Sequence, residues 1–407
     1  FKNSFEKAML KNEETLTIKH FGPIVEAQIS LRAFTVFIGE SGSGKSIVLK
    51  LLSLMRWILK KQYLKDFAKN AGQKDFYRFR IETMLRASGL DENFVKTDTY
   101  VEYQNRYKKI TFFKKDKKIT LNIANEQKAE GLFLEKISFI TDDRFGIAML
   151  LNNQMRNSSM PYHLQKTYED FITSFENLSD SKKIHIQTFD IELLKARYGI
   201  SQRFFIKDKE ALIQFHNSSS GMKSSSIIEI IIAYFSTIYD EEDDFGRFMV
   251  ELFLKTKFNN PNDFLKKIPV ISKKSFRLNF FIEEPELSLF PNAQKKLIEF
   301  LSEKFNGKKE THIIFSTHSP YVLSVLNCLL KAHLLSTQSK ALEKKVEKVI
   351  PKKNWLSADN FQAFKIKDGY IQSIIDEETN LILADEIDEV SDEIGSIFDD
   401  LLDLEFE

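Results

Sequence analysis

The stretch Phe34-Thr-Val-Phe-Ile-Gly39-Glu-Ser-Gly-Ser-Gly44-Lys45-Ser46 decides the fold of this chain. It consists of an apolar strand, a glycine-rich turn and the beginning of a helix expected over residues 47–60. The spacing Gly39-x-x-x-x-Gly44-Lys45-Ser46 matches the pattern of a phosphate-binding loop, and the flanking strand and helix supply the context that this pattern requires. A surface turn rich in small residues would fit the glycines and serines alone, but not this context.

The chemistry of the loop predicts which residues hold a nucleotide. Glycines allow successive backbone N–H groups to curl around an anion at the positive end of a helix, Lys45 reaches the β- and γ-phosphates, and the Ser46 hydroxyl is a ligand for Mg²⁺. We therefore expect a nucleotide polyphosphate and Mg²⁺ as cofactors. The expected cofactor-binding residues of the loop are Gly39, Ser41, Gly42, Ser43, Gly44, Lys45, Ser46 and Ile47.

Composition places the chain among soluble globular proteins. Its 407 residues are 43% hydrophobic and 29% charged, and no apolar run approaches the roughly 20 residues of a membrane span. The N-terminal stretch lacks the apolar centre of a signal peptide. The single cysteine, Cys328, excludes an internal disulfide and a cysteine-rich zinc site. We expect a cytoplasmic protein with no membrane contact.

Charge is distributed unevenly along the chain. All 59 Lys and Arg precede Asp376, whereas 14 of the 58 Asp and Glu lie at or after it, so residues 1–375 carry a formal charge of +15 and the tail carries −14. A basic body can attract polyanions, and an acidic tail can fold back or dock on a basic partner. Solvated surface charge is the more common explanation for a single charged run, but fourteen acids without one base in the 32 residues of the tail favour a specific role for it. The tail also has an apolar stripe at helical spacing, made of Ile387, Val390, Ile394, Ile397, Leu401 and Leu404.

The rest of the chain alternates strands and helices. Residues 16–24 and 25–31 have the pattern of two short strands joined at Gly22-Pro23. Further along we expect, in order, an antiparallel meander over 97–107, 109–114 and 118–123, a strand over 137–141 followed by Asp142-Asp-Arg144, a helical stretch from Pro161 to about Leu194, strands over 203–206 and 212–215, and a charged, partly helical insertion over 239–274.

Two later strand ends carry residues suited to phosphate chemistry. The apolar strand 278–282 ends in Glu283-Glu284-Pro-Glu286, and the strand 312–315 ends in Ser316-Thr-His-Ser-Pro320. A carboxylate there can hold the Mg²⁺ shell while its neighbour orients or deprotonates an attacking water. A lone histidine is more often structural, but the position of His318 at a strand end favours contact with phosphate and water. This layout predicts a doubly wound α/β sheet and a hydrolytic reaction.

The serine-rich segment 217–226 precedes the apolar helix expected over 227–238. Serine runs are usually linkers. Because this run contains Gly221 and leads directly into an apolar helix, it fits a second helix N-terminus that faces an anion better.

Four ordered motifs resemble those of one family. The chain resembles an ABC-type ATPase head of the branch that contains RecF, the structural-maintenance-of-chromosomes (SMC) proteins and the overcoming-lysogenisation-defect (OLD) ATPases. Residues 18–24 resemble the start of that branch, 219–224 its signature loop, 281–287 its Walker B segment and 316–320 its switch histidine. The resemblance covers roughly residues 14–375.

The resemblance implies an α/β fold: an ABC-type ATPase head with a doubly wound, mostly parallel core sheet, an antiparallel β lobe and an inserted helical segment. We expect four parts in the chain. These are the first part of the head with the P-loop and antiparallel lobe in 1–158, the inserted helical segment in 159–208, the second part of the head with the signature, Walker B and switch histidine in 209–375, and an acidic amphipathic tail in 376–407.

The resemblance also implies roles for individual residues. Two heads would sandwich ATP, so hydrolysis would require a homodimer or higher homo-oligomer. Glu284 would be the catalytic base, Glu283 the acid of the Mg²⁺ shell together with Ser46, and His318 the switch. The signature residues that would grip the γ-phosphate held by Lys45 and Ser46 of the other copy are Ser219, Ser220 and Gly221.

This chain departs from the family pattern at several positions. Glu283 stands where Asp is commoner, which lengthens the reach to Mg²⁺ and predicts slow, regulated turnover. Phe290 stands where the branch often has Asp or His, at a loop that communicates across the dimer. No glutamine clearly forms the glutamine loop of the family; the candidates are Gln73, Gln104 and Gln127.

The segment Asp142-Asp-Arg144 resembles, without its proline, an arginine motif common in defence-related members of the branch. Such members are the ATPase partners in PARIS-type, Septu-type and retron-associated systems. Together with a compact head and a tail suited to docking, this resemblance implies an ATPase that senses or scaffolds in a bacterial anti-phage complex and controls a separate effector, a nuclease or toxin. The alternative is a RecF-like ATPase of repair or recombination that contacts DNA or RNA on its basic body.

Two other functions fit the sequence poorly. A nuclease with an ATPase front end, as in OLD enzymes, needs an acidic metal site after His318, and Asp359, Asp368 and Asp376 do not form the strand-borne set required. A transporter subunit is disfavoured because the signature lacks a double glycine.

Overall fold

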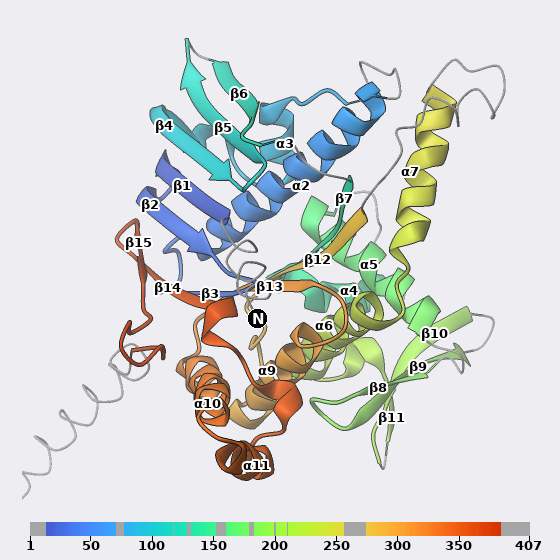
Figure 1. Ribbon diagram of the computed structural model, residues 1–407. Coiled ribbons are helices and arrows are strands. Elements are labelled where there is room, and N and C mark those ends of the chain that lie inside the picture. Colours follow the sequence, from blue (N-terminus) through green and yellow to red (C-terminus); the bar gives the residue numbers. More distant parts are fainter. Residues whose placement is uncertain are drawn as a thin grey trace, which may run out of the picture.

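The computed structural model describes residues 14–70, 77–116, 118–127, 132–151, 160–178, 183–198, 201–209, 211–255 and 274–383. Within them the main element is an 11-stranded sheet in the order β6-β5-β4-β1-β2-β15-β14-β3-β13-β12-β7 (Figure 1). Its strands are β1 (Glu14–Phe21), β2 (Ile24–Leu31), β3 (Phe34–Ile38), β4 (Val95–Gln104), β5 (Lys108–Lys115), β6 (Lys118–Asn125), β7 (Leu132–Ile140), β12 (Lys274–Glu283), β13 (Thr311–Thr317), β14 (Phe361–Lys367) and β15 (Tyr370–Ser373).

Half of this sheet is parallel. Strands β14, β3, β13, β12 and β7 run in the same direction. Every residue of β13 is buried, as expected for a strand covered on both faces. Because the carboxyl ends of parallel strands meet at one edge, the residues that follow β3, β7, β12 and β13 come together there.

The other half is the predicted antiparallel lobe. Strands β4, β5 and β6 form the expected meander, and β4 continues the sheet through its antiparallel pairing with β1. Buried and exposed positions alternate along β2, which is typical of a sheet with one face on the core and the other exposed to solvent. The lobe and the parallel core therefore form one continuous sheet.

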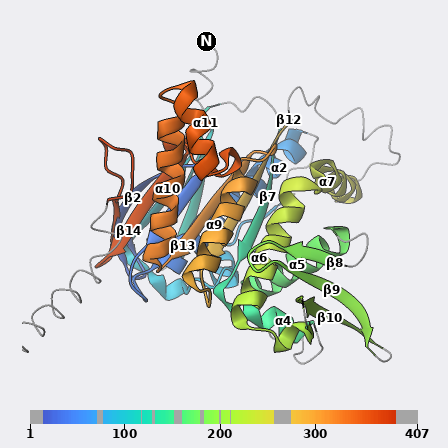
Figure 2. The ribbon, with the colours of Figure 1, turned by 90° about the horizontal axis from the view of Figure 1, so that it is seen from below.

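Helices cover both faces of the sheet. One face carries α2 (Lys45–Asn70), and the other carries α6 (Ser220–Thr237), α9 (Pro291–Phe305) and α10 (Pro320–Ser336) (Figure 2). The predicted α/β class with helices on both faces of a mostly parallel core is confirmed. The remaining α-helices of the described residues are α3 (Ile81–Ala87), α4 (Ile147–Leu150), α5 (Tyr162–Leu178), α7 (Glu241–Lys255) and α11 (Lys340–Val349).

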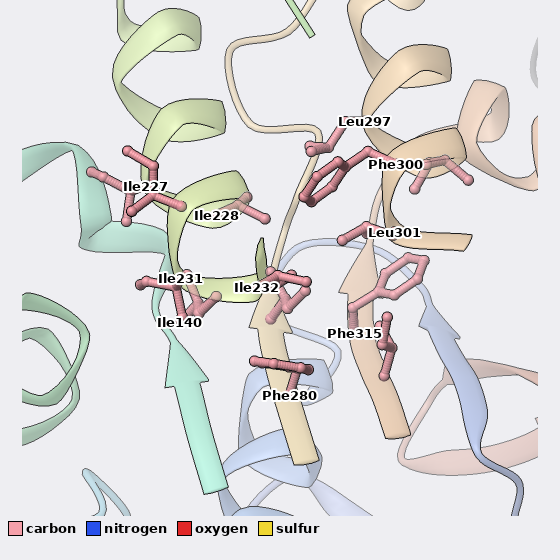
Figure 3. Close-up of a cluster of buried hydrophobic side chains, with 14 of the residues drawn as sticks. Ile140, Ile227, Ile228, Ile231, Ile232, Phe280, Leu297, Phe300, Leu301 and Phe315 are labelled. Carbon is pink, nitrogen blue, oxygen red and sulfur yellow. The ribbon is translucent and has the colours of Figure 1, made fainter. Parts of the chain in front are cut away.

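A large apolar core holds α6 and α9 on the parallel strands. Isoleucines of α6 and large side chains of α9 meet residues of β7, β12 and β13, and each is at most 3% exposed (Figure 3). Burying one such side chain stabilises the fold by about 1.5–3 kcal/mol, so this core fixes the strand ends that form the site. The residues are Ile140, Ile227, Ile228, Ile231, Ile232, Phe280, Leu297, Phe300, Leu301 and Phe315.

Helix α2 runs to Asn70, beyond the expected end at residue 60. Leu64, Phe67 and Ala68 continue its apolar pattern and pack with Phe248 and Leu252 of α7. The residues around 63–71 are helix-prone but polar, so the sequence did not show that they continue the same helix; α7 supplies the partner that stabilises the extension.

The expectation of a helical insertion is only partly correct. Helix α5 ends at Leu178, and the next described residues form a second, antiparallel sheet in the order β11-β10-β9-β8. In this sheet Ile186, Ile191, Leu193 and Ile206 are buried in the same core as α5 and α6. Ile191 and Leu193 stand two residues apart on β9, which is the period of a strand. The second sheet consists of β8 (Lys183–Ile186), β9 (Ile191–Tyr198), β10 (Ser201–Lys207) and β11 (Leu212–Gln214).

The expected apolar stripe of the tail lies outside the described residues, and the four domain boundaries remain predictions. The last described residues attach to α10, because Ile382 is 3% exposed and its backbone bonds the side-chain amide of Asn327. Among the described helices, none combines the length and the hydropathy needed to cross a bilayer.

Candidate active site

The glycine-rich loop between β3 and α2 has the backbone geometry of a phosphate cradle. Gly42 and Gly44 have φ angles of 80° and 107°, in the left-handed region that favours glycine. A Cβ at Gly39 would lie 2.4 Å from the carbonyl oxygen of Ile366 on β14, so a larger residue does not fit without a backbone shift. The loop opens at the N-terminus of α2, where backbone N–H groups can bind an anion.

Lys45, the first residue of α2, is held at this loop. Its ammonium donates to the carbonyls of Gly39 at 2.7 Å and Glu40 at 2.8 Å, and Nζ lies 3.4 Å from Nδ1 of His318. Burial lowers the pKa of Lys45, and the carboxylate of Glu284 opposes this decrease. The cation therefore faces both the loop and the ends of neighbouring strands.

Glu283, the last residue of β12, is buried beside the beginning of α2. Its Oε2 accepts hydrogen bonds from the Thr141 hydroxyl at 3.0 Å and the backbone N–H of Asp142 at 3.4 Å. Its Oε1 lies 3.5 Å from the ammonium of Lys50. Burial raises the pKa of Glu283, while Lys50 and the Ser46 hydroxyl oppose this increase.

The residues at this position fit a hard cation. Glu283 Oε1 is buried and accepts no hydrogen bond from the described residues within normal geometry, and the hydroxyl of Ser46 lies near the same carboxylate. Mg²⁺ prefers oxygen ligands of this kind and keeps the rest of its shell for water and phosphate. Ser46 and Glu283 would therefore hold Mg²⁺, while the loop would hold a polyphosphate.

Glu284 and His318 contact each other across two strand ends. Nε2 of His318 lies 2.8 Å from Oε1 of Glu284. Glu284 has a φ of 43°, which is uncommon for a residue with a side chain, and its N–H donates to the carbonyl of Ser316 on β13 at 3.0 Å. Lys45, His318 and Glu284 thus form a chain of contacts between residues that follow three different strands.

The loop that carries His318 is held by a second carboxylate, Glu286, which follows Glu284 in the segment after β12. Glu286 accepts hydrogen bonds from the Thr317 hydroxyl at 2.8 Å and the backbone N–H of His318 at 2.7 Å. Burial raises the pKa of Glu286, and these hydrogen bonds oppose the increase. The loop after β12 therefore determines where the histidine stands.

Arg144 lies beneath the ends of β7 and β12 and is fully buried. Its guanidinium donates to the carbonyls of Thr141 at 3.0 Å, Glu283 at 2.6 Å and Glu284 at 2.5 Å, and Nε donates to the Ser224 hydroxyl at 2.8 Å. Burial lowers its pKa to about 10, and neighbouring carboxylates oppose the decrease. The arginine remains a cation at neutral pH.

The signature loop lies at the beginning of α6. Ser219 caps the helix, and its hydroxyl accepts from the N–H of Met222 at 3.2 Å. A Cβ at Gly221 would lie 2.6 Å from the carbonyl oxygen of Ser288. Within one chain, Gly221 is therefore packed on the loop that follows β12, whereas the phosphate cradle follows β3.

Two site residues were not expected from the sequence. Thr141 and Lys50 contact Glu283, and only Lys50 left a signal, because it stands one helical turn after Ser46 on α2. Asp142 was noted only as part of the arginine motif, and its N–H also bonds Glu283. The end of β7 carries no glutamine. Of the candidates for a glutamine loop, Gln104 ends β4 and Gln127 bonds Arg106 beyond β6, both in the antiparallel lobe, and Gln73 lies outside the described residues.

Comparisons with known proteins agree with this chemistry over part of the chain. Residues 271–323 match the family described as AAA ATPase domain. The matched segment contains Glu283, Glu284, Glu286 and His318, so the match supports ATPase activity in general at this end of the sheet. No curated protein sequence matches the chain.

Several solved structures are similar to the chain at low sequence identity. An SMC head bound to the C-winged helix domain of ScpA has 10% identity and a TM-score of 0.40, covering 88% of this chain and 96% of that one. The SMC head domain from Thermotoga maritima has 12% identity and a TM-score of 0.38, covering 89% and 98%. The recombination mediator protein RecF-ATPrS has 11% identity and a TM-score of 0.34, covering 89% and 99%. At these values the similarities establish no activity and no partner for this chain.

Proposed function

We propose that this chain is a P-loop ATPase that binds ATP with Mg²⁺, hydrolyses it to ADP and phosphate, and does so as a head-to-head dimer. The observation that carries the proposal is the line of contacts from Lys45 through His318 to Glu284. These three residues stand beside a glycine cradle that fits a polyphosphate. In a P-loop ATPase a cation, a carboxylate and a polar switch residue are needed at one point of the sheet edge.

Each residue has a distinct task in this proposal. Lys45 and the backbone N–H groups of the loop bind the phosphates, and Ser46 and Glu283 hold Mg²⁺, which neutralises phosphate charge when bound. Glu284 orients the attacking water and accepts its proton, because its carboxylate is partly exposed and faces the cradle side. His318 lies between Lys45 and Glu284 and positions both.

The dimer is supported by apolar side chains at the same edge of the sheet. Phe145 and Met149 after β7, Phe290 after β12 and Tyr321 after β13 are exposed by 42%, 42%, 81% and 55%. Exposed aromatic groups around a polar site are typical of an interface. A second copy placed against this edge would bring its Ser219–Gly221 to the phosphates.

Glu284→Gln tests the proposal. The amide keeps the size of the side chain and cannot accept the proton of water, so ATP should accumulate in a stable dimer that sediments as twice the mass of the monomer. Lys45→Ala is the matched control, since it should bind no ATP and remain in the nucleotide-free state. If Glu284→Gln shows the same mass with and without ATP, the dimer mechanism is wrong.

The biological role that we propose is control of a separate effector in a bacterial anti-phage complex. This role rests on the resemblance of the segment Asp142-Asp-Arg144 to a motif of defence ATPases and on the acidic tail. Glu283 in place of Asp supports slow turnover, which suits a sensor better than a motor. A nuclease or toxin that co-purifies with the chain would be the expected partner.

A RecF-like role is the second candidate, because residues 1–375 carry a formal charge of +15. Such a body would bind duplex DNA through phosphates, with an affinity that falls steeply as salt increases. Tight, salt-sensitive duplex binding at physiological ionic strength would favour this role. Absence of binding under those conditions would leave the effector role.

A further inference from the structure

We propose that Arg144 couples the signature helix α6 to Glu284 of the same chain, so that engagement of Ser219–Gly221 with a second copy sets the hydrolytic competence of the first. This inference rests on the proposed ATPase function and adds a positioning residue to it. Arg144 lies in the turn after β7, the edge strand of the sheet, and its four side-chain hydrogen bonds go neither to the glycine loop nor to Lys45.

The first step is that Arg144 joins three separate segments. Its terminal nitrogens bond the carbonyl of Thr141 at the end of β7 and the successive carbonyls of Glu283 and Glu284 at the end of β12, at 3.0, 2.6 and 2.5 Å. Its Nε bonds Ser224 of α6 at 2.8 Å. The guanidinium is planar and its donors point in fixed directions, so a shift of one acceptor strains the other bonds.

The second step is that the backbone of Glu284 depends on these bonds. A φ of 43° is strained for a residue with a side chain and persists only where the surroundings hold it. Three groups hold this residue: its N–H donates to the carbonyl of Ser316, and its carbonyl accepts from Arg144 and from the N–H of Leu287. Arg144 is the side chain among these three groups, so a change at Arg144 shifts the Glu284 carboxylate and its 2.8 Å contact with His318.

The third step is that Ser224 moves with the signature loop. Ser224 lies about one helical turn after Gly221 in α6, and a helix transmits a displacement of its first turn as a rigid rod. The same turn is packed against the loop after β12, where Gly221 faces the carbonyl of Ser288. A movement of Ser219–Gly221 on engaging a second copy would thus reach Glu284 through Ser224 and Arg144.

Ser224→Ala is the decisive variant, and Ser226→Ala is its matched control. Both serines are buried in α6, but Ser226 has no hydrogen-bond partner among the described residues. Removing one hydrogen bond to a charged group should lower kcat about tenfold, with the Kd for ATP changed less than about twofold. The Hill coefficient for ATP should fall towards one in Ser224→Ala and stay at the wild-type value in Ser226→Ala.

Arg144→Lys is a second variant that tests the coupling. The lysine keeps a cation but cannot reach four acceptors, so we expect a larger loss of kcat than in Ser224→Ala and, again, an unchanged Kd for ATP. Circular-dichroism melting shows whether each variant is folded. If folded Ser224→Ala keeps the kcat and the Hill coefficient of Ser226→Ala, the coupling is wrong while the ATPase proposal stands. If the wild-type chain hydrolyses no ATP, both proposals are overturned.

Discussion

Nε2 of His318 and Oε1 of Glu284 lie 2.8 Å apart, although the whole of α9 separates the two residues in the chain. The contact exists because β12 and β13 are parallel neighbours, with Glu283 paired in register with Ser316. Residues that follow two adjacent parallel strands meet at one edge, and the α9 crossover makes this adjacency possible. In the ATPase mechanism that we propose, this contact places the histidine and the carboxylate at the same chemical step.

We expect His318→Asn to lower kcat by ~100-fold, the usual contribution of a group that acts on proton transfer. The Kd for ATP should change little, because the cradle and Lys45 are retained. Steady-state ATPase assays with equilibrium nucleotide binding measure both quantities. The control is His185→Asn, since His185 is about half exposed on β8, in the second sheet. Equal activity of the two variants would contradict the role given to His318.

The glycine cradle can be tested by adding one carbon. Gly39→Ala places a Cβ 2.4 Å from the backbone carbonyl of Ile366, and neither β3 nor β14 can move away without breaking their pairing. We expect at least about a tenfold weaker Kd for ATP, because the loop must distort. Gly246→Ala in α7 meets nothing within 4 Å and should stabilise the fold slightly, by about 0.5–1 kcal/mol. Unchanged ATP binding in Gly39→Ala would show that the loop is not the phosphate site.

A buried ion pair makes stability depend on pH. Burial alone would raise the pKa of Glu14, but Arg56 and Arg277 hold it well below its ordinary value. The Glu14 carboxylate therefore stabilises the fold at pH values above its ordinary pKa. This contribution is lost as the pH falls through the lowered pKa that Glu14 has in the folded state. We expect Glu14→Gln to lower the free energy of unfolding by about 3–5 kcal/mol near pH 7, because it leaves Arg56 buried without its partner charge.

Urea unfolding of wild type and Glu14→Gln between pH 7 and acid measures this effect, and the difference between them should shrink below about pH 4. The control is Glu26→Gln, whose pair with Lys19 at 3.2 Å has side chains 59% and 51% exposed. An exposed pair of this kind contributes little. A difference for Glu14→Gln that does not vary with pH would refute the assignment.

A truncation can be designed that keeps every C-terminal residue that the structure describes. Ile382 is buried and bonded to Asn327, so a truncation should begin at residue 384. We expect deletion of 384–407 to abolish binding of the effector and to leave ATP hydrolysis within about twofold of wild type. A pull-down of the co-purified partner with full-length and truncated chains measures the first quantity. Retention of the partner by the truncated chain would exclude the tail as the docking segment.

The local sequence was sufficient to predict those elements that depend only on neighbouring residues. The P-loop needs only glycines, Lys45 and a strand and helix at its sides, and the apolar strands that end at Glu283 and Ser316 are visible as runs of large residues. The meander over β4, β5 and β6 follows from alternation alone. In each case the interactions that define the element lie within a few residues of one another.

Sequence reasoning predicted two strands of the second sheet, β10 and β11, but not β8 and β9. The helical pattern, with apolar residues three and four apart up to Leu178, is expected to continue to about residue 194, which is wrong for residues 183–194. In the structure a turn at Asp190, whose φ is 56°, joins β8 and β9. Ile186 and Leu193 of these strands pack in the core that includes α5 and α6. The helices that bury one face of these strands are distant in the chain, so tertiary contacts override the local pattern.

The sequence by itself determined that this protein has the pattern of a phosphate-binding loop, an α/β fold and carboxylates and a histidine at strand ends, because residue type and spacing are local properties. Only the tertiary structure decided that Arg144 is bonded to the carbonyls of Thr141, Glu283 and Glu284 and to Ser224 of α6. Three of these four acceptors are backbone oxygens, which every residue type carries. Their convergence depends on strand order and helix packing, and no residue spacing records it.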